Sequence, residues 1–242
     1  MFLLQSPQPT RFDLNFTLAG IPVRVHPLFW VLALFLGIGS GNIIQILIWL
    51  GVVFISILVH ELGHALAFRR YDVDSYIVLH MMGGLTIPVS TPYGGGGAKT
   101  APSPGQQIMI SLAGPFAGFV LAGLIVGGVF FSGGAISLLP FSIFIPFGGQ
   151  LLWLIVTLFL WVNIFWGLVN LLPVFPLDGG QVARNILIQY DPFDGARKSL
   201  WLSTITGVVV GLAALYLLGS VYMAILFGFL ALQSYQAIGA RY

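Results

Sequence analysis

Residues 43–68 read IIQILIWLGVVFISILVHELGHALAF, a largely apolar run that is long enough to cross a lipid bilayer as one helix. Near its end stand His60, Glu61 and His64, and Glu61 is the only glutamate of the chain. An ionisable side chain inside a membrane-spanning segment costs about 3 kcal/mol or more, so it marks a functional candidate. These three side chains are therefore the first candidates for the functional site.

The composition of the whole chain agrees with a membrane protein. Of 242 residues, 58% are hydrophobic and only 7% are charged, against about 25% charged residues in a typical soluble domain. The nine Lys and Arg and seven Asp and Glu are scattered and leave a net charge of +2, so no basic stripe for nucleic acid is expected. Because the chain has no cysteine, any metal must be bound by His, Asp or Glu.

Five further apolar runs surround the segment 43–68. They cover residues 27 to about 38, about 106–131, 151 to about 172, and two halves of 200–240 that divide near Gly219 and Ser220. The run from residue 27 is the weakest candidate, since 12 to 14 helical residues reach only about 20 Å. The segment 133–150 is also apolar, but Pro140 and Pro146 break it. The pattern predicts an all-α polytopic membrane protein with about six transmembrane helices.

The cationic residues give this arrangement an orientation, because Lys and Arg accumulate on the cytoplasmic side of membrane proteins. With six spans, all nine of them fall on one side: Arg11, Arg24, Arg69, Arg70, Lys99, Arg184, Arg197, Lys198 and Arg241. We therefore expect an integral, multi-pass protein with both termini in the cytoplasm and the active site towards the cytoplasmic side. Residues 1–26 lack the pattern of a signal peptide.

Two segments outside the spans alternate apolar and polar residues as short strands do. They are residues 10–26 and the stretch YIVLHMMGGLTIPV within residues 71–104. Bare backbone cannot face lipid, so we expect membrane-associated strands and a re-entrant segment that is buried in protein or lines a wet cavity. Gly94 to Gly97 is expected to be a mobile linker.

The string HELGH at 60–64 has the HExxH spacing of metalloproteases, in which two histidines at i and i+4 share one helix face. A catalytic zinc ion usually has three protein ligands. Asp178, in NLLPVFPLDGG at 170–180, is the candidate for the third, and Gly179 and Gly180 are expected to permit a tight turn there. The alternative is that Asp178 caps a helix over residues 179–189, and the two roles are compatible.

In three of its sequence motifs the chain resembles the site-2 protease family of intramembrane zinc metalloproteases. HELGH at 60–64, SLAGPFAG at 111–118 and NLLPVFPLDGG at 170–180 are similar to its three signature blocks. IPVRVHPLFW at 21–30 resembles the compact subgroup without a PDZ or CBS domain, so no nucleotide-sensing domain is expected. The glycines of SLAGPFAG are expected to allow close packing beside the metal-binding helix.

The resemblance implies a role for each matching residue. His60, His64 and Asp178 would bind one zinc ion, and Glu61 would be the catalytic acid and base. Gly83 and Gly84 would lie in a re-entrant strand that pairs with unwound substrate, and Asn170 would help to hold it. For His26, which precedes Pro27, we expect a capping or interfacial role, and for His80 a structural one.

These observations predict one integral-membrane protease domain over residues 1–242. It would consist of N-terminal surface strands at 1–26, catalytic core spans at 43–190 and a C-terminal helical pair at 200–242. Its expected function is to hydrolyse a peptide bond within or near the transmembrane segment of a single-span membrane protein in the lipid bilayer, which is regulated intramembrane proteolysis.

Two alternatives stay open. A catalytically silent relative would bind membrane helices, but it would be expected to lack one of the four polar residues. A secondary transporter also has broken helices and intramembrane charges, but it has no reason to place a glutamate between two histidines.

Overall fold

The computed structural model describes residues 7–37, 42–81, 83–89, 101–138 and 141–239. The chain divides into two compact units. The N-terminal unit comprises Ser6–Gly95 and Ala113–Leu168, and the C-terminal unit comprises Met1–Gln5, Gly96–Leu112 and Val169–Tyr242. The single domain over residues 1–242 stays a prediction, and the expected linker at Gly94 to Gly97 lies outside the described residues.

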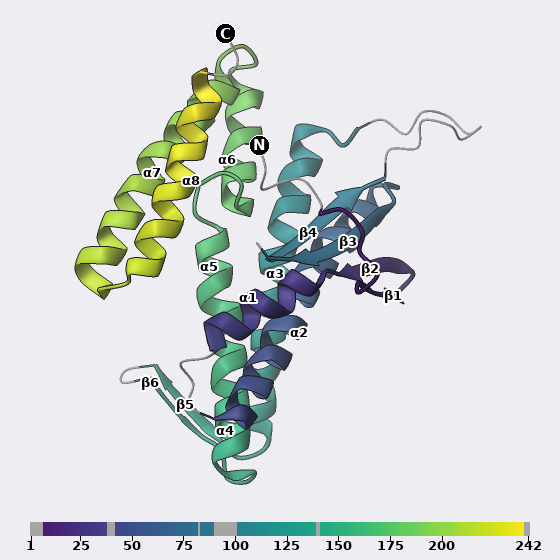
Figure 1. The fold of residues 1–242 in the computed structure, drawn as a ribbon, viewed down its shortest axis with the longest axis vertical. Coiled ribbons are helices and arrows are strands. Elements are labelled where there is room, and N and C mark those ends of the chain that lie inside the picture. Colours follow the sequence, from purple (N-terminus) through teal and green to yellow (C-terminus); the bar gives the residue numbers. More distant parts are fainter. Residues whose placement is uncertain (1–6, 38–41, 82, 90–100, 139–140, 240–242) are drawn as a thin grey trace. The chain divides into compact units, whose positions relative to one another are not determined.

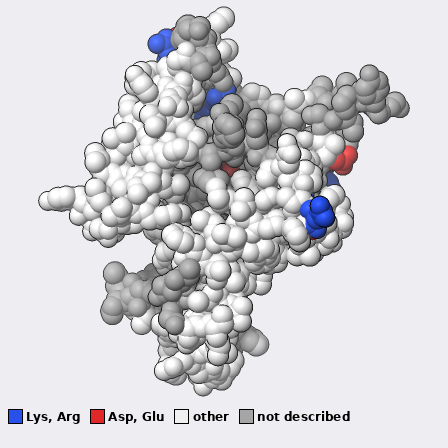
Figure 2. Space-filling view, viewed as in Figure 1, with Lys and Arg blue, Asp and Glu red and all other residues white. Residues whose placement is uncertain are grey.

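Among the described residues, five helices are long and apolar enough to cross a membrane, which confirms an all-α, multi-pass architecture. They are α2 (Ile43–Arg70), α3 (Pro104–Phe131), the continuous helical segment Gly149–Asn170, α7 (Gly195–Leu218) and α8 (Val221–Gly239). Figure 2 shows how few charged side chains appear on the visible face of the molecule.

The predicted sixth span is only a short helix. It is α1 (Pro27–Gly37), whose 11 residues rise about 16 Å, well short of a hydrocarbon core of about 30 Å. The prediction of six spans is therefore approximate. The placement of both termini on one side depends on α1 crossing the bilayer, and it stays a prediction.

A four-stranded sheet confirms the strands that were predicted within residues 10–26 and 71–104 (Figure 1). Its strands are β1 (Leu14–Leu18), β2 (Ile21–Val25), β3 (Ser75–His80) and β4 (Gly83–Pro88), in the order β1-β2-β3-β4. β2 and β3 are parallel, whereas the outer pairs are antiparallel. β4 is therefore an edge strand of this sheet.

One face of the sheet packs on α2. Alternate residues of β2 and β3, such as Val23, Ile77 and Leu79, are buried and belong to one hydrophobic cluster with Leu58 and Ala65 of α2. This alternation follows from the two-residue period of a strand. The sheet is thereby held against the helix that carries the polar cluster.

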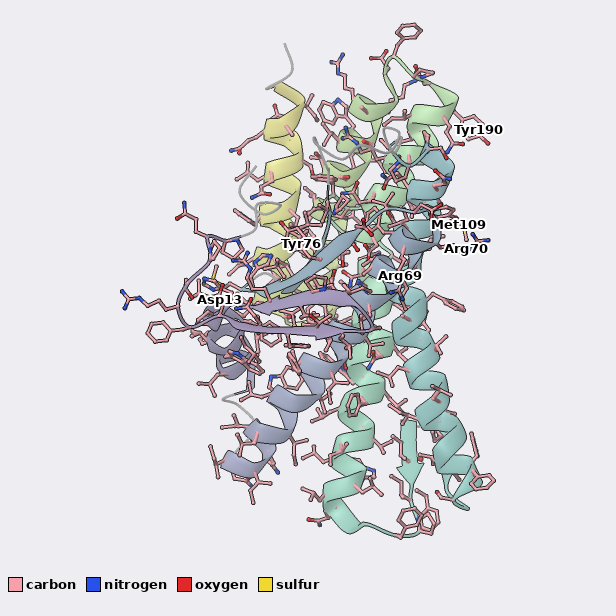
Figure 3. All side chains as sticks on the ribbon, turned by 90° about the vertical axis from the view of Figure 1, so that its right-hand side faces the viewer. Asp13, Arg69, Arg70, Tyr76, Met109 and Tyr190 are labelled. Atoms are coloured by element: carbon pink, nitrogen blue, oxygen red, sulfur yellow. The ribbon has the colours of Figure 1, made fainter. Side chains whose placement is uncertain are left out.

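The β1–β2 hairpin is also tied to the end of α2. Its turn places Ala19 and Gly20 at φ 51° and 78°, the left-handed backbone typical of tight hairpins. The guanidinium of Arg69 donates a hydrogen bond of 2.7 Å to the Ala19 carbonyl. Figure 3 labels Arg69 on α2 and Asp13 before β1, where Asp13 pairs with Arg24 at 3.3 Å.

His26 has the predicted capping role. Its Nδ1 accepts a hydrogen bond of 3.2 Å from the backbone N–H of Leu28, and its carbonyl accepts one of 2.9 Å from Phe29. Its own N–H donates to the Leu79 carbonyl at 2.8 Å. His26 therefore begins α1 and joins it to β3.

The sequence did not predict a second, two-stranded sheet. β5 (Ala135–Leu138) and β6 (Phe141–Phe144) pair antiparallel inside the apolar segment 133–150. Four residues per strand are too few for a clear alternation. Packing supplies the stability, because the paired Ile136 and Ile143 join a hydrophobic cluster with Ala122 of α3 and Leu160.

The C-terminal unit contains α6 (Asp178–Tyr190) and the helical pair α7 and α8. α7 ends at Leu218 and Gly219 is its C-cap residue with φ 62°, so the predicted division near Gly219 and Ser220 is confirmed. A Cβ atom at Gly207 would lie 3.0 Å from the Cβ of Ala231. Small residues thus let α7 and α8 approach closely, as in many membrane helix pairs.

A π-helical turn interrupts the third long span of the chain. The segment Gly149–Asn170 consists of α4 (Gly149–Leu160), the π-helix η3 (Trp161–Trp166) and α5 (Gly167–Asn170). The Nδ2 group of buried Asn163 donates hydrogen bonds of 2.9 Å to the Phe159 carbonyl and to Ser56 Oγ of α2. A π turn disturbs the i to i−4 ladder, and this side chain provides a replacement donor that also links two spans.

This link between α2 and η3 can be tested with Ser56→Ala. The substitution removes one interhelical hydrogen bond, and such bonds contribute about 0.6 kcal/mol on average and at most about 1.7 kcal/mol in membrane proteins. We expect the Tm of the detergent-purified protein to fall measurably. Thr157→Val is the matched control, since Thr157 Oγ1 is buried without a hydrogen-bond partner among the described residues and should not lower the Tm. A Tm of Ser56→Ala equal to wild type would contradict the role of this bond.

Candidate metal centre

α2 brings together the two histidines that the HExxH spacing predicts on one face, with Glu61 beside them. Metal-binding atoms of His60, Glu61 and His64 all lie within 4.8 Å of one another. Glu61 and His64 are buried, with 5% and 8% of their surface exposed, and His60 is half-buried. The i, i+4 spacing explains the contact between the two histidines, and the i, i+3 spacing brings Glu61 near His64.

The two imidazoles fit one zinc ion. Their Nε2 atoms face each other at 3.1 Å. Two Zn–N bonds of about 2.0 to 2.1 Å with tetrahedral geometry would place the nitrogens about 3.3 Å apart. A donor set of imidazole nitrogens and a carboxylate oxygen also suits zinc.

α3 covers the two imidazoles from one side, where its Gly114 lies against them. A Cβ atom at Gly114 would lie 2.8 Å from His60 Nε2 and would overlap the His64 ring. On α2 itself, a Cβ atom at Gly63 would lie 2.8 Å from the Cβ of Ala117 and would overlap the Ala113 carbonyl. The two helices therefore pack backbone to backbone, as SLAGPFAG predicts.

β4 covers Glu61 from another side. A Cβ atom at Gly84 would overlap the carboxyl group of Glu61. The Thr86 hydroxyl lies 2.7 Å from Glu61 Oε2 and 3.0 Å from the Glu61 carbonyl oxygen. Gly84 and Thr86 are two residues apart and so lie on the same face of β4. This is the face towards α2, because their register partners on β3, Leu79 and Ile77, belong to the hydrophobic cluster with α2.

Of the two predicted substrate-binding glycines, only Gly84 contacts the polar cluster. Gly83 has φ 113°, a conformation that favours glycine, and open space surrounds its Cβ position. It pairs with His80 where β4 begins. Gly83 therefore serves the turn of the strand pair, and its proposed contact with substrate stays a prediction.

Asp178 and Asn170 belong to the C-terminal unit, and their roles in metal and substrate binding stay predictions. Asp178 is the first residue of α6, and Leu177 occupies the N-cap position. The alternative that Asp178 itself caps this helix is therefore wrong by one residue. Its negative charge in the first turn still stabilises the helix, because it faces the positive end of the helix dipole.

Gly179 and Gly180 do not form the tight turn that we expected. Both lie inside α6, where Cβ atoms would come within 2.6 Å of the Leu172 and Val174 carbonyl oxygens, respectively. The first turn of α6 thus packs directly on the preceding backbone. That backbone is held in turn by α7, since the Phe175 N–H donates to Ser203 Oγ at 3.0 Å.

His80 is not part of the three-residue cluster. It is buried at the end of β3. Burial, and after it the electrostatic influence of His26 and Arg24, hold the pKa of its imidazole below the ordinary value. His80 is therefore neutral near pH 7, in keeping with a structural role.

Sequence reasoning did not single out Thr86. A threonine in a strand is unremarkable, and the residue lies 25 positions from Glu61. Only the packing of β4 against α2 shows that its hydroxyl meets the glutamate.

Three comparisons with known proteins agree with this site. Residues 48–214 match the sequence profile of peptidase family M50. A zinc metalloprotease of Methanocaldococcus jannaschii is 30% identical over 176 residues, which are 71% of this chain and 44% of that protein. Rip3 of Mycobacterium tuberculosis is 31% identical over 173 residues, 71% of this chain and 35% of Rip3. The chain thus spans less than half the length of these curated relatives.

The fold has a counterpart among solved structures. A site-2 protease from Methanocaldococcus jannaschii superimposes with a TM-score of 0.56 and 23% sequence identity, over 94% of this chain and 95% of that one. Because the profile match covers more than half of the residues, the chain belongs to peptidase family M50, the site-2 protease family of zinc metalloproteases.

Proposed function

We propose that this protein is an intramembrane zinc endopeptidase that cleaves a single-span membrane protein within or near its transmembrane segment. The observation that carries the proposal is the buried His60–Glu61–His64 cluster on a helix long enough to cross the membrane. A buried glutamate beside two converging imidazoles has a chemical purpose in metal-assisted hydrolysis.

His60 and His64 would hold the zinc ion through Nε2, and Asp178 would be the third ligand. When bound, zinc lowers the pKa of a coordinated water to about 7 and polarises a peptide carbonyl. Glu61 accepts the proton of the attacking water and returns it to the departing amine. Its burial against β4 keeps the carboxylate beside the reacting atoms.

The substrate would bind as an extended strand. A transmembrane helix hides its carbonyls in its own hydrogen bonds, so it must unwind before hydrolysis. β4 is the edge strand of its sheet, and pairing with it would compensate for bonds that unwinding breaks. We assign Gly83, Gly84 and Asn170 to this binding step, with Gly84 beside Glu61.

We also propose that both termini and the active site face the cytoplasm. The support is the distribution of the nine Lys and Arg residues along the chain.

The mechanism predicts the behaviour of Glu61→Gln. The amide keeps the shape of the side chain but cannot accept the proton, and general acid–base catalysis contributes about 10²- to 10⁴-fold. We expect cleavage of a purified single-span substrate to fall at least about 100-fold, with zinc content unchanged by metal analysis. Equal cleavage by both proteins would refute the mechanism. Binding of the substrate without cleavage by wild type would instead indicate a catalytically silent relative.

The proposed third ligand predicts that Asp178→Ala weakens zinc binding. Loss of one of three protein ligands should lower the affinity at least about tenfold, as measured by competition with a chromogenic chelator. Asp194→Ala is the matched control, because Asp194 is an exposed carboxylate at the start of α7. If both variants bind zinc as tightly as wild type does, Asp178 is not a ligand.

The close approach of α3 predicts that Gly114→Ala disturbs the metal site. The added Cβ would overlap the His64 ring and crowd His60 Nε2, so the imidazoles must move apart. We expect zinc affinity to fall at least about tenfold, by the same competition assay. Gly123→Ala, on the same helix but with nothing within 4 Å of its Cβ position, should bind zinc normally. Normal zinc binding by Gly114→Ala would show that the site has room for the methyl group.

A further inference from the structure

The hydroxyl of Thr86 makes two contacts with a single residue of α2. Its Oγ1 lies 2.7 Å from Glu61 Oε2 and 3.0 Å from the Glu61 carbonyl oxygen. A hydroxyl carries one proton, so both oxygens compete for the same donor. The threonine is branched at Cβ, which restricts its χ1 angle and keeps the hydroxyl aimed at Glu61.

The carboxyl group of Glu61 is confined from two directions by the same strand. Gly84 provides the space that the carboxyl group occupies, because a Cβ atom there would overlap it. Two residues further on, Thr86 supplies the hydrogen-bond donor on the same face of β4. β4 itself is fixed by six register pairs with β3.

We propose that Thr86 is a positioning residue for Glu61, which rests on the proposed function of this site. Thr86 holds Oε2 and thereby orients Oε1 towards the water whose proton Glu61 accepts. A free glutamate side chain has several rotamers, and most of them point its carboxylate away from the reacting atoms. The hydrogen bond selects one of them before substrate arrives.

The position of Thr86 on the edge strand gives this contact a second consequence. A substrate that pairs with β4 takes its register from the same strand that holds the catalytic carboxylate. The scissile bond and Glu61 are therefore placed by one rigid element. Precise placement of this kind matters, since a displacement of about 1 Å can cost about 100-fold in rate.

The test uses Thr86→Val, which replaces the hydroxyl by a methyl group of similar size, and Thr86→Ser, which keeps the hydroxyl. Each is assayed as full-length protein for kcat and KM with a single-span reporter substrate, and for zinc content and Tm. We expect Thr86→Val to lower kcat about 10- to 100-fold, with KM and zinc content close to wild type and a fall in Tm no larger than that of Ser56→Ala. Thr86→Ser should restore most of kcat, and Thr17→Val, on exposed β1, should change nothing.

Three results would overturn the proposal. A normal kcat in Thr86→Val, measured where Glu61→Gln abolishes cleavage, would remove the role of Thr86 and leave the proposed function intact. A loss of zinc or Tm in proportion to activity, without rescue by serine, would show a structural role only. Absence of cleavage by the zinc-loaded wild type would overturn both proposals together.

Discussion

A buried ionisable cluster on a membrane-spanning helix persists only where protein groups replace the water that lipid excludes. Here the cluster is His60, Glu61 and His64, and two neighbouring elements provide that environment. α3 brings Gly114 against both imidazoles, and β4 brings a glycine and a threonine hydroxyl against the glutamate. The helix thus keeps its polar side chains because protein packs against each of them.

The same constraint explains why a protein of membrane helices contains a sheet at all. Glutamate needs a donor and close-fitting backbone, and a strand supplies both at a spacing of two residues. The sheet is held by an apolar face on α2, by the capping histidine at the start of α1 and by Arg69 at the β1–β2 turn. Its outer strand β4 touches the glutamate and has no strand partner on its other side among the described residues.

Much of this arrangement follows from local patterns. Long apolar runs predicted the five long helices, alternation predicted β1 to β4, and i, i+4 spacing predicted the shared face of the two histidines. The failures have physical causes as well. The β5–β6 hairpin is too short for a clear period, and its stability comes from packing on α3 and α4. Gly179 and Gly180 lie inside a helix, where they allow close contact with the preceding backbone. A pair of glycines with this role cannot be told from a turn by the sequence.

Hydropathy and helical spacing are properties of neighbouring residues, so the amino-acid sequence alone indicates a membrane protein with the HExxH triplet on one of its helices. Which distant residues touch that triplet depends on the tertiary structure. Thr86 meets Glu61 across 25 positions and Gly114 meets His60 and His64 from another helix. Strand register and the approach of two helices depend on the simultaneous packing of side chains from several segments, and no single stretch of sequence contains that information.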